Sequence, residues 1–336
     1  MKALLLVNLG TPDSPDKKAV KKYLREFLND PRVIDFPTLK RTLLVNGIII
    51  PARAGNSTEI YKEVWTEKGS PLLYHTADLA AKMQEEMGED WDVYFGMRYQ
   101  SPSLNSVMSV IEGKAYSELV IVPLYPQYAS SSTGSTSQKI MEIISKWEVI
   151  PTFRMINSFF EKEEFINVLV DNGAKHDVKK YDHVLFSYHG LPERHIQKSC
   201  KIDGCTYESC INKCDSNSMY CYRSACYETT RQTVKKLGLK EGEYTVAFQS
   251  RLGKDPWIQP FSDVVIADLA KKGVKNMLVF SPAFVADCLE TIVEIGTEYQ
   301  EIFKEHGGET IQLVESMNSN DNWVKALKSI VLDKSF

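Results

Sequence analysis

The stretch HVLFSYHGLP, residues 183–192, shows a strand-and-turn pattern that recurs along the chain and indicates its fold. A run of apolar and aromatic residues passes directly into a histidine and a glycine, which is typical of a buried strand that ends in a sharp turn. The stretch ALLLVNLGTP, residues 3–12, follows the same plan. We interpret both as strands of a parallel sheet, because continuous apolar strands are those covered on both faces.

Two further strand patterns follow in each half. They are DVYFGMRYQSP and ELVIVPLYPQY in the first half, and YTVAFQSRLGKDPW and NMLVFSPAFVAD in the second, with helical patterns between them. The sequence therefore predicts an α/β fold of two Rossmann-like lobes with parallel sheets, residues 1–155 and 156–336, and an active-site cleft between them. Ligands bind beyond the carboxyl ends of such strands. Residues expected at these ends are Asn8, Arg98, Tyr99, Tyr125, Gln127, His189, Ser250 and those after Phe284.

Composition excludes several classes of protein. The chain has 336 residues, 43% of them hydrophobic, and a net charge of −4 without a basic tail, which argues against a nucleic-acid partner. No GxGxxG or Walker A sequence is present, so no nucleotide cofactor is expected. The N-terminal run is too short for a signal peptide, and no run has the roughly 20 apolar residues of a spanning helix. We expect a cytoplasmic protein whose thiols stay reduced.

Two groups of residues are candidates for proton and metal chemistry. His189 follows a buried strand, and an imidazole there accepts a proton near neutral pH, although a structural histidine is the alternative. Residues 284–302, read as a helix, place four carboxylates along one face, where they could conduct a divalent cation or the protons it displaces. A solvated helix face is the alternative. The four are Asp287, Glu290, Glu294 and Glu298.

Six of the seven cysteines lie within 27 residues and predict a metal or cluster site. Their spacing matches neither a zinc ribbon nor a bacterial ferredoxin run, so spacing alone leaves zinc and an iron–sulfur cluster open. Cys288 stands apart and is read as a simple buried thiol. Residues 27–61 are apolar and are expected to be irregular. They suggest a lip over a large flat ligand, a membrane-surface contact, or ordinary packing.

Six motifs, taken in order over nearly the whole chain, resemble ferrochelatase. They are VNLGTPDS, FGMRYQSP, PLYPQYASSSTGS, SYHGLPERH, QSRLGKDPWIQP and SPAFVADCLETIVEI. The resemblance implies a lyase of heme biosynthesis that inserts Fe²⁺, its substrate, into protoporphyrin IX with release of two protons. Coproporphyrin III or another tetrapyrrole is the alternative substrate, and a non-catalytic heme- or metal-binding protein is the rival of another class. No oligomeric state is predicted.

The resemblance also implies roles for particular residues. His189 and Glu290 are the implied catalytic pair, which with Asp287, Glu294 and Glu298 would handle the iron. Implied porphyrin contacts are Tyr61, in a lip spanning about residues 30–75, and Arg98, Tyr99 and Tyr125. A cysteine-rich insert, about residues 195–230, resembles that of bacterial members with an internal [2Fe–2S] cluster. Its implied ligands are Cys221, Cys226 and two of Cys200, Cys205, Cys210 and Cys214. Cys288 departs from the family, since many relatives carry a histidine there.

Overall fold

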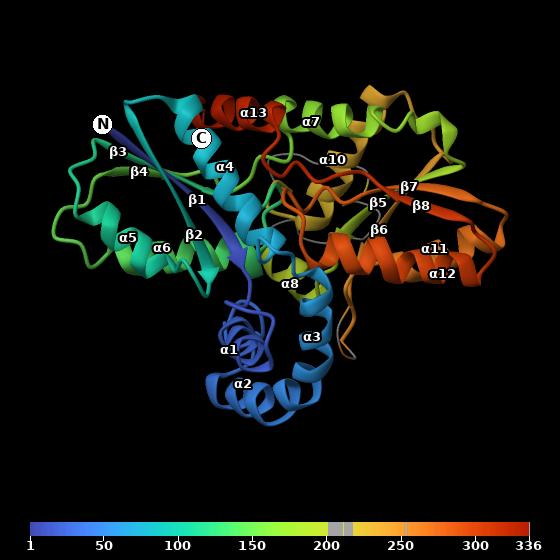
Figure 1. The fold of residues 1–336 in the computed structure, drawn as a ribbon, viewed down its shortest axis with the longest axis horizontal. Coiled ribbons are helices and arrows are strands. Elements are labelled where there is room, and N and C mark those ends of the chain that lie inside the picture. The colour runs from blue at the N-terminus through green and yellow to red at the C-terminus, as the bar shows by residue number, and fades with distance from the viewer. Residues whose placement is uncertain (201–210, 212–217, 252, 254, 336) are drawn as a thin grey trace. The chain divides into compact units, whose positions relative to one another are not determined.

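The computed structural model describes residues 1–200, 211, 218–251, 253 and 255–335 (Figure 1). The chain divides into two compact units. Unit 1 comprises Met1–Tyr125, Ala129–Ser158 and Asn318–Phe336, and unit 2 comprises Pro126–Tyr128 and Phe159–Met317. The sequence interpretation had assigned all of residues 156–336 to the second lobe.

The C-terminal helix belongs with unit 1 because it is tied to elements of that unit. In this helix, α13, Lys328 donates to the Glu86 carboxylate at 3.0 Å. Arg154 of β4 donates to two carbonyl groups at the end of α13, those of Val331 and Asp333. These contacts have no signature in the sequence, since the partners are more than 170 residues apart.

Each unit is built on a four-stranded parallel sheet. The order is β2-β1-β3-β4 in unit 1 and β6-β5-β7-β8 in unit 2, so the two units share one topology. The predicted α/β class with two parallel sheets is confirmed. The strands are β1 Lys2–Gly10, β2 Trp91–Tyr99, β3 Glu118–Pro123, β4 Thr152–Met155, β5 His183–His189, β6 Tyr244–Gln249, β7 Asn276–Phe280 and β8 Thr310–Leu313.

The two central strands, β1 and β5, are buried along almost their whole length, as their unbroken apolar sequences predict. Each ends beside the end of its neighbour, since Gly10 pairs with Tyr99 and His189 pairs with Gln249. The chain therefore brings polar residues from adjacent strands together at the carboxyl edge of each sheet, where ligands of such folds bind.

Helices cover both sheets. In unit 1, Asp16 caps the first helix by accepting hydrogen bonds from the backbone N–H groups of Lys18 and Ala19. The helices of unit 1 are α1 Lys17–Leu28, α2 Thr38–Leu44, η1 Val45–Ile49, α3 Ile50–Val64, α4 Pro71–Met87, α5 Leu104–Glu112, η2 Ser130–Gly134, α6 Ser135–Ile144 and α13 Asp321–Leu332. Those of unit 2 are α7 Glu163–Ala174, η3 Val178–Lys180, α8 Glu193–Ser199, α10 Tyr222–Leu237, α11 Ser262–Lys271, η4 Glu290–Tyr299 and α12 Gln300–Glu305.

The expectation of an irregular segment over residues 27–61 is wrong from residue 38 onward, although residues 29–37 form neither helix nor strand. The chain is helical without a break from Thr38 to Val64, as α2, the π-helix η1 and α3 in succession. Pro51 lies inside this continuous helix, directly after the π-helical turn η1 and the first residue of α3. Val45, Ile50 and Ala54 of this segment are buried in a small core with Leu28. Among the described residues, no helix has the length and apolar character needed to cross a membrane.

Candidate active site

His189 is the last residue of β5 and is half-buried. Its Nδ1 lies 2.6 Å from the carbonyl oxygen of Gly190, and a carbonyl oxygen can only accept a hydrogen bond. The hydrogen therefore sits on Nδ1, which leaves the lone pair of Nε2 available to take a proton. The hydroxyl of Tyr222, on α10, donates to the His189 carbonyl oxygen at 2.9 Å and fixes the backbone at this point.

Gly190 is required at the turn that follows His189. A Cβ at this position would lie 2.7 Å from the carbonyl oxygen of Gln249, closer than side chains approach backbone. The Gly190 N–H donates to the same oxygen at 2.8 Å. The glycine that the sequence places after the histidine thus allows β5 to stay close to the end of β6.

The carboxylate row lies on and before the π-helix η4, and not on one α-helical face. Asp287 precedes the helix, which begins at Glu290, and Asp287 accepts a hydrogen bond of 3.3 Å from Thr291. The expected register is therefore wrong for Asp287, because it assumed an α-helix through the whole segment. Glu298, one turn further along η4 than Glu294, is exposed. Glu290 is half-buried.

Gln249 connects the strand pair β5–β6 to the carboxylates of η4. Its Nε2 donates to the Glu290 carbonyl oxygen at 3.3 Å and to the Glu294 carboxylate at 2.9 Å. Because Gln249 is the register partner of His189, the histidine and Glu290 lie at the same edge of one sheet. The pairing of His189 with Glu290 in the reaction stays a prediction, and Gln249, to which the sequence analysis gave no role, connects the elements that bear them.

Cys288 is buried, as its sequence reading expected, two residues before Glu290. Burial raises the pKa of its thiol well above the usual value, and the nearby charge of Glu290 raises it further. The side chain therefore stays a neutral thiol at physiological pH. Its backbone N–H donates to the Thr291 hydroxyl at 3.0 Å, which holds the start of η4.

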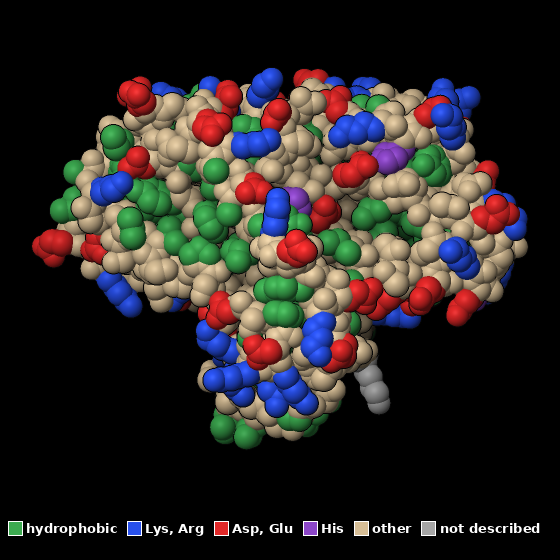
Figure 2. Space-filling view, in the orientation of Figure 1, with side chains coloured by type: hydrophobic (Ala, Val, Ile, Leu, Met, Phe, Trp, Pro, Cys, Tyr) green, Lys and Arg blue, Asp and Glu red, His purple; other side chains and the backbone are tan. Residues whose placement is uncertain are grey.

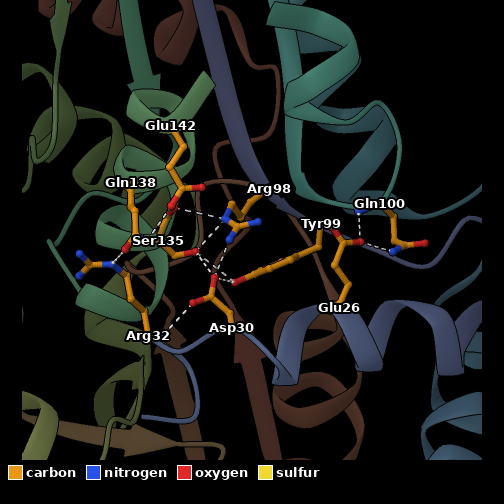
Figure 3. Close-up of polar contacts among 9 residues, drawn as sticks. All are labelled: Glu26, Asp30, Arg32, Arg98, Tyr99, Gln100, Ser135, Gln138 and Glu142. Atoms are coloured by element: carbon orange, nitrogen blue, oxygen red, sulfur yellow. Dashed lines mark hydrogen bonds and ion pairs between the residues drawn. The ribbon is translucent and has the colours of Figure 1, made fainter. Parts of the chain in front are cut away.

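Unit 1 carries a polar cluster at the end of β2 (Figure 3). One oxygen of Asp30 accepts hydrogen bonds from Arg98 at 2.6 Å, from Tyr99 at 2.9 Å and from Ser135 at 2.5 Å. The other oxygen accepts from the backbone N–H of Arg32 at 2.7 Å. The side chain of Asp30 is 4% exposed and that of Arg98 15%. Sequence reasoning identified Arg98 and Tyr99 and missed Asp30, which neutralises the arginine.

The remaining expected porphyrin contacts also lie in unit 1. Burial, followed by the charge of Asp30, raises the pKa of Tyr99 far above its ordinary value, so its hydroxyl remains a donor. Burial likewise raises the pKa of Tyr125, which follows β3. Tyr61, on α3, is half-buried and packs edge-on against Tyr23, with ring centroids 6.0 Å apart.

The structure describes the cysteine-rich insert at its two ends and at residue 211. Cys221 and Cys226, at the start of α10, are 1% and 0% exposed, and burial raises the pKa of the Cys226 thiol. Cys200, after α8, is half-buried. Within the described part of the chain, no three His, Cys, Asp or Glu side chains are placed to hold a metal ion together. Cys205, Cys210 and Cys214 lie outside the described residues.

Comparisons with known proteins cover nearly the whole chain. The family model described as Ferrochelatase matches residues 1–335. A curated ferrochelatase of Legionella pneumophila (strain Lens) is 46% identical over 330 residues, which are 98% of each chain. One from Coxiella burnetii (strain Dugway 5J108-111) is 40% identical over 327 residues, which are 96% of this chain and 91% of the relative.

Solved structures support the fold. SirB from Bacillus subtilis with Fe³⁺ superposes with a TM-score of 0.50 at 12% identity, over 98% of this chain and 96% of SirB. A multi-domain protein of Deinococcus radiodurans, described as similar to chelatases, gives a TM-score of 0.52 at 10% identity, over 100% of this chain and 56% of that protein. At these identities the likeness concerns the chelatase-like fold alone.

Proposed function

This chain belongs to the ferrochelatase family, and we propose that His189 and Glu290 carry its reaction, the insertion of Fe²⁺ into protoporphyrin in heme biosynthesis. The observation that supports this most directly is the hydrogen bond from His189 Nδ1 to the Gly190 carbonyl, which leaves Nε2 as a proton acceptor. The reaction makes the chain a lyase with two substrates, a porphyrin and a ferrous ion.

The chemistry requires that two pyrrole protons leave as iron enters the macrocycle. His189 Nε2 and the Glu290 carboxylate offer two acceptors at one sheet edge, and positioned acceptors of this kind contribute roughly 10²- to 10⁴-fold in rate. Asp287 and Glu298 add negative charge along the approach to η4, which favours a divalent cation over anions. Arg98, Tyr99, Tyr125 and Tyr61 are the proposed porphyrin contacts of unit 1.

The identity of the porphyrin is tested by an anaerobic assay with ferrous iron, followed by absorption spectroscopy. We propose protoporphyrin IX, with two carboxylates, over coproporphyrin III, with four. Wild-type protein should convert protoporphyrin IX several times faster, and Glu290→Gln should convert neither at a comparable rate. Faster turnover of coproporphyrin III would reassign the substrate. Binding of porphyrin without any metalation would identify a carrier instead of an enzyme.

A [2Fe–2S] cluster in the cysteine-rich insert is a further part of the proposal. Its support is the resemblance of the insert together with the thiols of Cys221 and Cys226, which are buried at the start of α10. Thiolates are the ligands that such clusters use. The raised pKa of Cys226 means that coordination would be needed to keep it as a thiolate near neutral pH.

Metal and sulfide analysis of anaerobically purified protein tests this cluster. We expect about two iron and two sulfide ions per chain. Cys221→Ser and Cys226→Ser should lose both, whereas Cys288→Ser, which changes a buried thiol outside the insert, should keep them. Stoichiometric zinc without sulfide would replace the cluster with a structural zinc site.

We also propose a cytoplasmic protein that contacts membrane surfaces through α2 and η1. Leu39, Leu43 and Ile48 of these helices are 74%, 65% and 64% exposed, and Figure 2 shows hydrophobic side chains at the tip of this segment below several Lys and Arg side chains. Exposed apolar groups beside basic ones suit an anionic lipid surface. Leu43→Ser should weaken flotation with anionic vesicles, and Val149→Ser, at an exposed apolar residue elsewhere in unit 1, should not.

A further inference from the structure

Glu294 has a fully occupied carboxylate. Its Oε1 accepts from the Ser250 N–H at 2.8 Å and from the Tyr299 hydroxyl at 3.1 Å. Its Oε2 accepts from Gln249 Nε2 at 2.9 Å and from the Ser250 hydroxyl. A carboxylate has about four lone-pair positions, so these four donors use them all. A metal ion or a proton could reach Glu294 only by displacing bonds that the fold supplies.

The donors to Glu294 are themselves held in fixed conformations. Ser250 has a φ of +64°, a left-handed conformation that is uncommon for residues other than glycine, and Glu294 accepts hydrogen bonds from both its N–H and its hydroxyl. Burial, then the charge of Glu294, raises the pKa of Tyr299 far above its ordinary value, so its hydroxyl stays a donor. The carboxylate therefore fixes the end of β6.

Gln249 connects Glu294 to Glu290 through hydrogen bonds. Its Oε1 accepts from the Ser187 hydroxyl at 2.7 Å, which leaves the Nε2 group directed at η4. There it donates to Glu294 and to the backbone carbonyl of Glu290, the first residue of the helix. Gln249 is 1% exposed, so water cannot readily substitute for these bonds. A shift of Glu294 would free Gln249, and with it the turn that bears Glu290.

We propose that Glu294 is a positioning residue, which through Gln249 holds Glu290 in place, and that it conducts neither iron nor protons. This rests on the proposed role of Glu290 in metalation. The proposal gives the carboxylates of the row different roles. Glu290 acts on the substrate, and Glu294 holds the surrounding residues in position. Glu301, an exposed carboxylate of α12 to which no role is assigned, serves as the matched comparison.

The test is a double-mutant cycle of Glu294→Gln and Gln249→Ala, with kcat and the KM for Fe²⁺ measured anaerobically. Each single variant should lower kcat by roughly 10- to 100-fold, the effect expected from misplacing a reacting group by about 1 Å. The KM for Fe²⁺ should stay within about twofold. The double variant should be no slower than the slower single variant, because both changes break one connected chain of contacts.

The opposite results would overturn the proposal. If Glu294 conducted iron, Glu294→Gln would raise the KM for Fe²⁺, and its effect would multiply with that of Gln249→Ala. Equal losses of kcat in Glu294→Gln and Glu301→Gln would also contradict it. Should Glu294→Gln fail to fold, Ser250→Gly removes one hydroxyl donor at a φ that suits glycine, and it should lower kcat without changing KM. Wild-type turnover by Glu290→Gln would instead refute the proposed function.

Discussion

The carboxyl edges of the two sheets follow one plan but differ in charge. β2 and β6 occupy the same place in their sheets, and each is followed by a residue with positive φ, Gln100 at +65° and Ser250 at +64°. In each case a helical glutamate accepts the backbone N–H of that residue. Glu26 accepts from Gln100 at 3.1 Å, and Glu294 accepts from Ser250 at 2.8 Å.

The two units differ at the second-to-last residue of β2 and β6. Unit 1 has Arg98 there, and its guanidinium neutralises the buried Asp30. Unit 2 has the buried Phe248 at the corresponding position, and the donors to Glu294 are uncharged. The edge in unit 1 is therefore a neutral polar wall, which suits an organic ligand. The edge in unit 2 keeps its negative charge beside His189, which suits a cation and its displaced protons.

The strongest test of this contrast is the removal of the proton acceptor from unit 2. His189→Ala should lower turnover by roughly 10²- to 10⁴-fold, because it deletes the proposed proton acceptor. The hydrogen bond to the Gly190 carbonyl holds the hydrogen of this imidazole on Nδ1 and leaves Nε2 to accept the proton. The far-UV circular dichroism and the affinity for porphyrin should stay close to wild type. Wild-type turnover in this variant would remove His189 from the reaction and with it the assigned role of the unit 2 edge.

The neutral cluster of unit 1 predicts a loss of stability. Asp30→Asn leaves the half-buried guanidinium of Arg98 without its counter-charge, and the cost should approach the roughly 3–5 kcal/mol of breaking a fully buried ion pair. Urea unfolding followed by fluorescence measures the change. Asp13→Asn, which removes the exposed pair with Lys22, is the control and should cost far less. Equal losses in the two variants would mean that the Asp30 cluster is not the buried pair described above.

The contrast shows how far sequence reasoning reaches. Strand periodicity and the rule for strand ends identified Arg98 and His189, because both depend on local pattern and on topology. Asp30 was missed because it lies in a loop 68 residues before Arg98, and nothing in its neighbourhood marks it as a partner. Ser250 was expected at a strand end, whereas the bond from Gln249 to Glu294, 45 residues later in the chain, was missed for the same reason as Asp30. The π-helix was read as an α-helix since carboxylate spacing alone does not distinguish them.

The two glutamates that cap the positive-φ residues offer a matched pair. Glu26→Gln should reduce the free energy of unfolding by about 1 kcal/mol, the level of a single hydrogen bond, because an amide accepts only through one oxygen. Turnover should stay within about twofold, since Glu26 contacts Gln100 and not the carboxylates of η4. Glu294→Gln should cost turnover instead. If Glu26→Gln slowed metalation as much as Glu294→Gln, the proposed difference between the edges would be wrong. In that proposal the unit 1 edge is structural and the unit 2 edge takes part in the reaction.

The smallest effect concerns the opposite ends of the strands. In unit 1, Glu118 at the start of β3 pairs with Lys2 at 2.8 Å and with Arg154 at 3.1 Å, whereas unit 2 has the uncharged Asn276 at the start of β7. The hydrogen bond from Lys2, assisted by Arg154, holds the pKa of Glu118 below its usual 4.5.

A lowered carboxyl pKa stabilises the folded state above the unfolded pKa, and the contribution is lost as the pH falls through the folded value. Wild-type protein should therefore exceed Glu118→Gln in stability at pH 7 by at most about 1 kcal/mol, because these side chains are partly exposed. The difference should shrink below about pH 4.5. Thermal unfolding midpoints of both proteins between pH 7 and pH 3.5 measure it. A stability difference that grows as the pH falls would mean that the folded state favours the protonated form of Glu118. Two cationic partners favour the charged form, so this result would contradict the prediction.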